Sequence, residues 1–180
     1  MLRTVVARGI GLECVSQGEL EHVLGLFPEL PHAQILFTPN FAPRAEYEFA
    51  FARGLRVTLD NLHPLREWGD LLEGREVFVR VDTGHGRGHH DHVRTAGLHS
   101  KFGVPLFELD ELGRLARERQ VRITGLHAHT GSGVFNVHNW AETAAQLAGL
   151  AQLIRESDQI NRRSALAQGQ HLVENFTVRV

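Results

Sequence analysis

Two histidines, a serine and three glycines are concentrated in segment 125–133, whose sequence is Gly-Leu-His-Ala-His-Thr-Gly-Ser-Gly. His127 and His129 are two residues apart, so in an extended chain they face the same side. An imidazole in such a place can bind a metal ion, transfer a proton or lie flat against an aromatic ring. This segment is therefore the first candidate for a functional site.

The second half of the same segment is suited to binding an anion. Gly131 and Gly133 leave the backbone amides around them uncovered, and Ser132 adds a hydroxyl donor. Amides and hydroxyls arranged in this way can bind a phosphate group. The sequence therefore predicts an anion site directly after the histidines.

The elements on either side place this segment at a turn between a strand and a helix. Residues 121–124 alternate between apolar and polar, as in a strand, and residues 139–154 have apolar side chains at helical spacing. In α/β folds such turns lie at the carboxyl end of the strands, which is where ligands bind. We therefore expect the histidines to lie at a ligand-binding edge.

The rest of the chain alternates strands of about four to seven residues with longer helices. The predicted strands are 11–16, 35–38, 56–59, 76–81 and 121–124, and the predicted helices are 17–24, 43–53, 61–72, 106–119 and 139–154. This order is typical of βαβ units and a parallel sheet, either doubly wound or closed into a barrel. Because a complete (β/α)8 (TIM-type) barrel takes about 250 residues, a barrel would be partial here.

Composition limits the classes of function. The chain has 180 residues, 42% of them hydrophobic, and a formal net charge of −2. We expect one globular domain, no nucleic-acid partner, and no association with a membrane, because no apolar run approaches the roughly 20 residues that span a bilayer. The single cysteine, Cys14, favours a reducing compartment and hence the cytoplasm. Lys101 is the one lysine among 19 basic residues.

Four stretches, spread in order over about residues 9–155, carry a resemblance to a known family. They are residues 11–20 (GLECVSQGEL), 35–40 (ILFTPN), 100–104 (SKFGV) and 125–133 (GLHAHTGSG). Together they resemble the pyridoxal-phosphate-binding barrel of the alanine-racemase-like, fold-type III decarboxylases, which include diaminopimelate, ornithine and arginine decarboxylases. The resemblance implies a partial (β/α)8-type barrel over residues 1–156.

The resemblance also implies roles for individual residues. In such a site His129 would stack on the ring of pyridoxal 5′-phosphate and Ser132 would bind its phosphate, together with Gly131 and Gly133. Glu13, Glu19 and Arg80 match polar positions near the cofactor, and Lys101 matches a lysine near the interface of the family's homodimer. For Glu13 and Glu19, a surface charge and the acid of a capping box with Ser16 are equally open; Lys101 has an alternative as a surface lysine.

The activity implied is decarboxylation of a basic or diamino acid, with meso-diaminopimelate, in lysine biosynthesis, as the expected substrate and ornithine or arginine as alternatives. The histidine-rich segment 84–92 suggests the subgroup fused to an aspartate kinase. The family's Schiff-base lysine has no counterpart here, and neither do its later glycine-rich loop, its pyridinium-binding glutamate and its β-domain. The sequence therefore resembles a fragment that is inactive alone, and residues 157–180 match nothing in the family.

Three other possibilities stay open on the sequence. A His-x-His pair at the end of a strand is also typical of metal-dependent amidohydrolases, although those need further ligands and residues 157–180 offer only His171. The loop histidines could themselves bind zinc or nickel, and they are His85, His89, His90, His92 and His99. The third possibility is that the chain is a non-catalytic remnant of a cofactor pocket.

Overall fold

The structure is a computed structural model that describes residues 1–84, 101–131, 136–166 and 177–179. Its strands form one sheet in the order β1-β2-β3-β4-β6-β7, with β5 paired to β4, and each pairing is parallel. The strands are β1 (Leu12–Cys14), β2 (Ile35–Phe37), β3 (Arg56–Leu59), β4 (Glu76–Asp82), β5 (Val104–Pro105), β6 (Arg122–His127) and β7 (Thr177–Arg179). The expected parallel sheet is confirmed.

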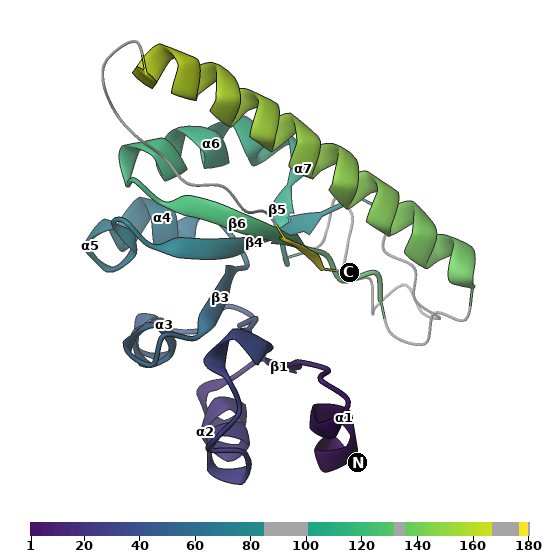
Figure 1. The fold of residues 1–180 in the computed structure, drawn as a ribbon. Coiled ribbons are helices and arrows are strands. Elements are labelled where there is room, and N and C mark those ends of the chain that lie inside the picture. The colour runs from purple at the N-terminus through teal and green to yellow at the C-terminus, as the bar shows by residue number, and fades with distance from the viewer. Residues whose placement is uncertain (85–100, 132–135, 167–176, 180) are drawn as a thin grey trace.

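Helices connect the strands and pack on one side of the sheet (Figure 1). They are α1 (Leu2–Ala7), α2 (Gln17–Leu26), α3 (Arg44–Ala52), α4 (His63–Glu67), α5 (Gly69–Leu72), α6 (Leu109–Glu118) and α7 (Val137–Leu166), with short 3-10 turns η1 (His32–Gln34) and η3 (Leu106–Glu108). In the figure, the sheet runs from β1 near the N-terminus to β4, β6 and β7 beneath α7.

The predicted helix over residues 61–72 is wrong in one respect, because the structure divides it into α4 and α5 at Trp68. Gly69, which follows, is buried, and a Cβ there would lie 2.5 Å from Nη1 of Arg119. The Arg119 side chain thus occupies the space beside the backbone where the two helices meet. Asn61, predicted as the N-cap, accepts a hydrogen bond from the His63 amide, while the residue at the cap position is Leu62.

The start of α2 follows the sequence pattern closely. The Ser16 hydroxyl accepts a hydrogen bond from the Glu19 amide at 3.3 Å, and the Glu19 carboxylate accepts one from the Val15 amide at 2.8 Å. The first bond is that of a capping box, whereas the Glu19 carboxylate bonds the amide of the residue before the N-cap and not that of Ser16 itself.

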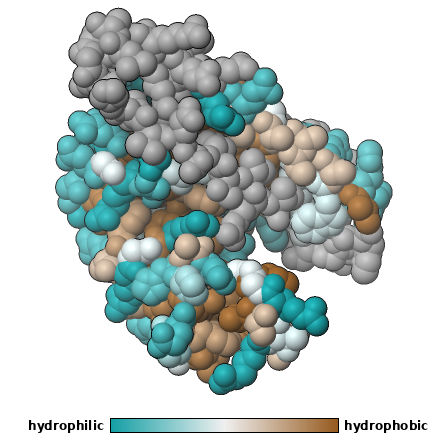
Figure 2. All heavy atoms as spheres, viewed as in Figure 1, coloured by the Kyte–Doolittle hydropathy of each residue, from teal (hydrophilic) through white to brown (hydrophobic). Residues whose placement is uncertain are grey.

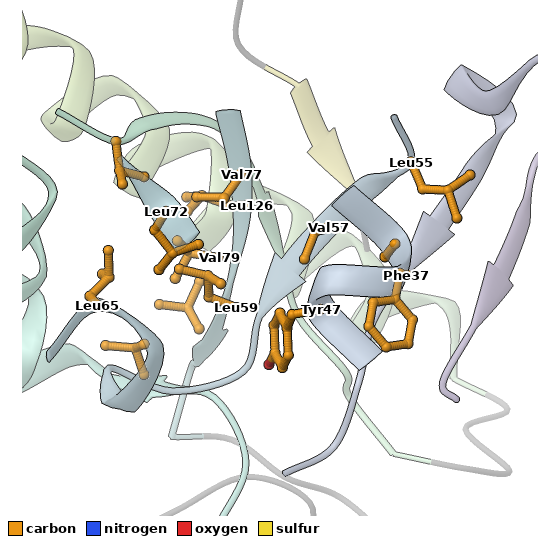
Figure 3. Close-up of a cluster of buried hydrophobic side chains, with 14 of the residues drawn as sticks. Phe37, Tyr47, Leu55, Val57, Leu59, Leu65, Leu72, Val77, Val79 and Leu126 are labelled. Atoms are coloured by element: carbon orange, nitrogen blue, oxygen red, sulfur yellow. The ribbon is translucent and has the colours of Figure 1, made fainter. Parts of the chain in front are cut away.

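The hydrophobic core lies between the sheet and the helices (Figure 3). Leu59, Val79 and Leu126 come from three neighbouring strands, and Leu65 and Leu72 come from the helices that cover them. Strand β4 is buried from Val77 onward on both faces. Because side chains alternate along a strand, every second residue of the same strands is directed to the opposite face, which carries polar groups.

Helix α7 continues beyond the predicted end at residue 154 as far as Leu166. Strand β7 falls within residues 175–180, whose sequence is strand-like, and it pairs with β6, with Gly125 opposite Thr177. Strand β6 also continues through His127, so the first histidine of the 125–133 segment is part of the strand and not of the turn. Among the described residues, no helix is both long enough and apolar enough to cross a membrane.

The surface in Figure 2 mixes hydrophilic and hydrophobic residues, and apolar side chains are exposed at the N-terminal end of the chain. Ile10 is 56% exposed and Val15 is 43% exposed, on either side of β1. Strand β1 is also the outer strand of the described sheet. An outer strand carries backbone groups that can pair with another chain.

Candidate functional site

A set of buried polar side chains lies at the carboxyl ends of the central strands, on the face opposite the hydrophobic core. They are Thr38 after β2, Thr58 and Asp60 at the end of β3, Arg80 in β4, His127 in β6 and Thr130 just beyond it. Each is at most 6% exposed. Buried polar groups cost free energy unless they are satisfied, so their concentration at one edge marks this edge as the candidate site.

Arg80 is at the centre of this set. Its Nη1 donates to Asn40 Oδ1 at 2.8 Å and to Asp60 Oδ1 at 3.1 Å. The Arg80 and Asp60 side chains are 6% and 0% exposed, so this is a buried ion pair. A buried charge is tolerated when it is paired and hydrogen-bonded, and the pair fixes a guanidinium at the end of β4.

Only one oxygen of the Asp60 carboxyl, Oδ1, accepts the hydrogen bond from Arg80 among the described residues. Burial raises its pKa, although the Arg80 charge acts in the opposite direction. Within the described part of the chain, its Oδ2 is buried and has no hydrogen-bond partner.

A short segment, residues 102–104, lies next to Arg80. The guanidinium carbon lies 5.0 Å from the centre of the Phe102 ring, which is the distance of a cation–π contact. The Gly103 amide donates to the backbone oxygen of Asp60 at 2.9 Å, and Val104 then pairs with Val81. Residues 102–104 are therefore anchored to the ends of both β3 and β4.

Glu13 and His127 meet across the polar face. The Glu13 carboxylate lies 3.7 Å from Nε2 of His127, although their strands, β1 and β6, are not neighbours in the sheet. Glu13 is about half exposed, whereas His127 is buried. Glu13, carried over from the resemblance, is thus directed toward the same face as Arg80.

His129 lies between the buried residues His127 and Thr130, two positions after the end of β6, and is exposed. Even so, the protein atoms around the ring, followed by the Arg80 charge, lower the pKa of His129, while the Glu13 carboxylate raises it by a smaller amount. A pKa below the ordinary value favours the neutral imidazole, and a neutral flat ring can stack on an aromatic ligand.

The residues around the predicted anion site are described in part. The Thr130 hydroxyl is buried and, among the described residues, has no partner, and Gly131 has a φ of 115° that favours glycine. An unpaired donor next to a glycine turn at the end of a strand fits an anionic group. Ser132 and Gly133 lie outside the described residues, so their part in the site stays a prediction.

The two remaining residues of the predicted site, Glu19 and Lys101, are not part of the buried polar set. Glu19 is exposed and occupies the capping box of α2. Lys101 is exposed, with its Nζ 5.1 Å from the centre of the Phe102 ring. Any role of Glu19 or Lys101 toward a cofactor or a dimer interface stays a prediction.

The metal hypotheses gain no ligand set here. Within the described ranges, no group of three or more His, Cys, Asp or Glu side chains could hold a metal ion. The histidine-rich segment, including His85, His89 and His90, lies outside those ranges, and so does His171.

Sequence reasoning missed Asp60, Asn40 and the ring of Phe102 as parts of the site. A signal was present for Asp60, because it directly follows a strand, and the carboxyl ends of parallel strands share one edge. No signal existed for its pairing with Arg80, which is 20 residues away. Phe102 was noted only as part of the 100–104 stretch.

Comparison with known proteins identifies what this arrangement is similar to. The family model described as "pyridoxal-dependent decarboxylase, pyridoxal binding domain" matches residues 1–161. The chain is 32% identical over 160 residues to the diaminopimelate decarboxylase of Methanothermobacter thermautotrophicus, a match that covers 87% of this chain and 36% of that protein. The chain thus spans about a third of the length of this curated relative.

Solved structures have the same fold. A diaminopimelate decarboxylase from Helicobacter pylori complexed with L-lysine superposes with a TM-score of 0.75 at 19% identity, over 86% of this chain and 40% of that one. A second diaminopimelate decarboxylase structure gives a TM-score of 0.69 at 25% identity, over 98% of this chain and 40% of that one. The expected α/β fold, a partial barrel, is confirmed by these matches.

Proposed function

Because this chain belongs to the pyridoxal-dependent decarboxylase family through its pyridoxal binding domain, we propose that it forms part of the pyridoxal 5′-phosphate site of an amino-acid decarboxylase. The observation that carries the proposal is the buried Arg80–Asp60 pair close to His129, at the carboxyl ends of parallel strands. A fixed cation and a neutral imidazole at this edge fit an anionic, aromatic ligand.

The residues of the chain divide the binding work between them. His129 offers a flat neutral ring to the aromatic part of the cofactor, and Thr130 and Gly131 offer a hydroxyl and a glycine turn to its phosphate. Arg80 provides a positive charge that the surrounding protein shields from water. Ser132 and Gly133 would complete the phosphate contacts, as the resemblance implies.

The chemistry of the cofactor, when bound, is to serve as an electron sink for the electron pair that remains when carbon dioxide leaves an amino acid. What the protein contributes is position and electrostatics. Arg80 lowers the pKa of His129 and so favours a ring that neither repels nor attracts through a net charge. The Glu13 carboxylate acts in the opposite direction on the pKa of His129.

The substrate we propose is meso-diaminopimelate, in lysine biosynthesis. Support comes from the diaminopimelate decarboxylases among the relatives, including the one at 32% identity. Ornithine is the alternative, because an ornithine decarboxylase of Neurospora crassa is 29% identical over 136 residues. A homodimer in the complete enzyme and a fusion to an aspartate kinase stay predictions; the histidines that suggest the fusion lie outside the described residues.

These 180 residues contain one side-chain amine that could react with the cofactor's aldehyde, on Lys101. The neutral amine of a lysine is the form that reacts with an aldehyde, and activation usually requires burial or a neighbouring cation. Lys101 is exposed. We therefore propose that the chain alone binds pyridoxal 5′-phosphate weakly and without a covalent bond, and that it does not decarboxylate amino acids.

The test is a titration of the 180-residue chain with pyridoxal 5′-phosphate, followed by near-ultraviolet and visible absorbance and then by borohydride reduction and peptide mapping. The proposal predicts saturable binding of one equivalent and no stoichiometric adduct on Lys101. A stoichiometric adduct there, together with carbon dioxide release from a diamino acid, would show that the lysine assignment is wrong. Absence of any saturable binding would contradict the proposed site.

A further inference from the structure

The Arg80 guanidinium is held from three directions by groups that belong to different parts of the chain. Asn40, after β2, and Asp60, after β3, accept hydrogen bonds from the same nitrogen, Nη1. The centre of the Phe102 ring lies 5.0 Å from the guanidinium carbon. A long flexible side chain is thus confined in one place by residues 20 to 40 positions away.

The segment that carries Phe102 has little freedom of its own. The Gly103 amide is bonded to the Asp60 backbone oxygen, and a Cβ on Gly103 would lie 2.8 Å from the Asp82 amide nitrogen. Gly103 also has a φ of 82°, a conformation that favours glycine. The backbone that follows the ring therefore holds Phe102 next to Arg80.

Asp60 links these two restraints. Its side chain binds the Arg80 guanidinium and its backbone oxygen binds the Gly103 amide. The Asp60 side chain is 0% exposed, so no solvent competes for the ion pair. Asp60 therefore restrains both the Arg80 guanidinium and the backbone of the segment that carries Phe102.

We propose that Asp60 and Phe102 are positioning residues for Arg80, and that the affinity of the site for pyridoxal 5′-phosphate depends on them although neither contacts the cofactor. This inference rests on the proposed function for its ligand, but the restraint on Arg80 does not. Lys101 Nζ also lies near the Phe102 ring, 5.1 Å from its centre. The ring thus faces two cations, one buried and one exposed.

The experiment compares Asp60→Asn and Phe102→Leu in the full chain, with Phe102→Tyr, which keeps the ring, and Asp70→Asn, which alters a surface ion pair with Arg44, as controls. The first readout is nitrogen NMR of the arginine side chains, with the Arg80 signal assigned by its loss in Arg80→Gln. We expect proton exchange and rotation of the Arg80 guanidinium to be faster in Asp60→Asn and Phe102→Leu and unchanged in both controls. Far-ultraviolet circular dichroism verifies that each variant is folded.

The second readout is the dissociation constant for pyridoxal 5′-phosphate. Asp60→Asn should weaken binding about tenfold and Phe102→Leu about fivefold, whereas Phe102→Tyr should restore the wild-type value. In an Arg80→Gln background neither change should weaken binding further, because both act through Arg80.

The outcomes separate this inference from the proposed function. If the wild-type chain does not bind the cofactor, the proposed function fails, and the NMR result alone decides whether Asp60 and Phe102 position Arg80. Unchanged guanidinium dynamics in both variants would overturn the inference. Losses of affinity that persist in the Arg80→Gln background would also overturn it, because the two residues would then act on the ligand without Arg80.

Discussion

Glu13 Oε1 lies 3.7 Å from His127 Nε2, although β1 and β6 are separated in the sheet by β2, β3 and β4. In a flat sheet, side chains four strands apart cannot meet, since neighbouring strands are about 4.8 Å apart. The contact therefore requires the sheet to curl toward its polar face. This curvature is that of a barrel, and it brings residues from β1 and β6 to one site.

The first prediction concerns the electrostatic coupling across this face. Glu13→Gln removes a carboxylate that raises the pKa of His129, so the pKa of His129 should fall further, whereas Arg80→Gln removes a cation that lowers it, so the pKa should rise. Proton NMR titration of the histidine ring measures both directions. Glu21→Gln, an exposed change on α2, is the control and should leave the His129 titration unchanged. Shifts of the same sign in both site variants would contradict this coupling.

The second prediction is a pH dependence of stability. The pKa of His129 is lower in the folded chain than its ordinary value, so the unfolded chain binds more protons as the pH falls below about 6.5. The contribution of His129 to stability is therefore present above that pH and is lost as the pH falls through the folded pKa. Urea unfolding of the wild type and of His129→Gln between pH 7.5 and 5 measures it. The variant should lose less stability on acidification, and parallel pH curves would count against the shift.

A third prediction concerns Gly103, where the backbone of two strands approaches closely. Gly103→Ala places a Cβ 2.8 Å from the Asp82 amide nitrogen and also forces alanine to a φ of 82°. We expect a loss of about 2–4 kcal/mol in the free energy of unfolding, the sum of conformational strain and overpacking. Gly9→Ala is the matched control, because Gly9 has a φ of 73° but no atom within 4 Å of its Cβ position. An equal loss in both variants would show that crowding at Gly103 is absent.

The sequence predicted the strands and most helices because their patterns are local. The strands predicted over residues 56–59 and 76–81 and the hydrogen bond from the Glu19 amide to Ser16 depend on near neighbours, and the structure confirms them. What the sequence missed depends on distant contacts. Where α4 and α5 meet, the Arg119 side chain lies beside Gly69, 50 positions away in the sequence.

The candidate site shows the same division. The strand-end position of His129 was predictable from the glycine-rich turn that follows it. The pairing of Arg80 with Asp60 and the placement of the Phe102 ring depend on how three strands and a loop meet. The sequence pattern of a single strand or helix does not predict contacts between such distant elements.

A fourth prediction uses the single cysteine as a reporter of folding. Cys14 is 1% exposed, and burial raises its pKa to about 11. Since the thiolate is the reactive form, alkylation at pH 8 should be slower in the folded chain than in urea by a factor of about 100 or more. Mass spectrometry of iodoacetamide-treated samples measures the two rates. Similar rates would mean that β1 is not packed against the core in solution.

If this edge of the sheet binds pyridoxal 5′-phosphate through His129, the His129→Ala variant must bind the cofactor more weakly than the wild type. Absorbance titration gives the dissociation constants of the wild type, of His129→Ala and of His22→Ala, which alters an exposed histidine on α2. Loss of a stacking partner worth about 0.5–1.5 kcal/mol should weaken binding about two- to tenfold in His129→Ala, while His22→Ala should bind like the wild type. Equal affinity in all three proteins would contradict the claim.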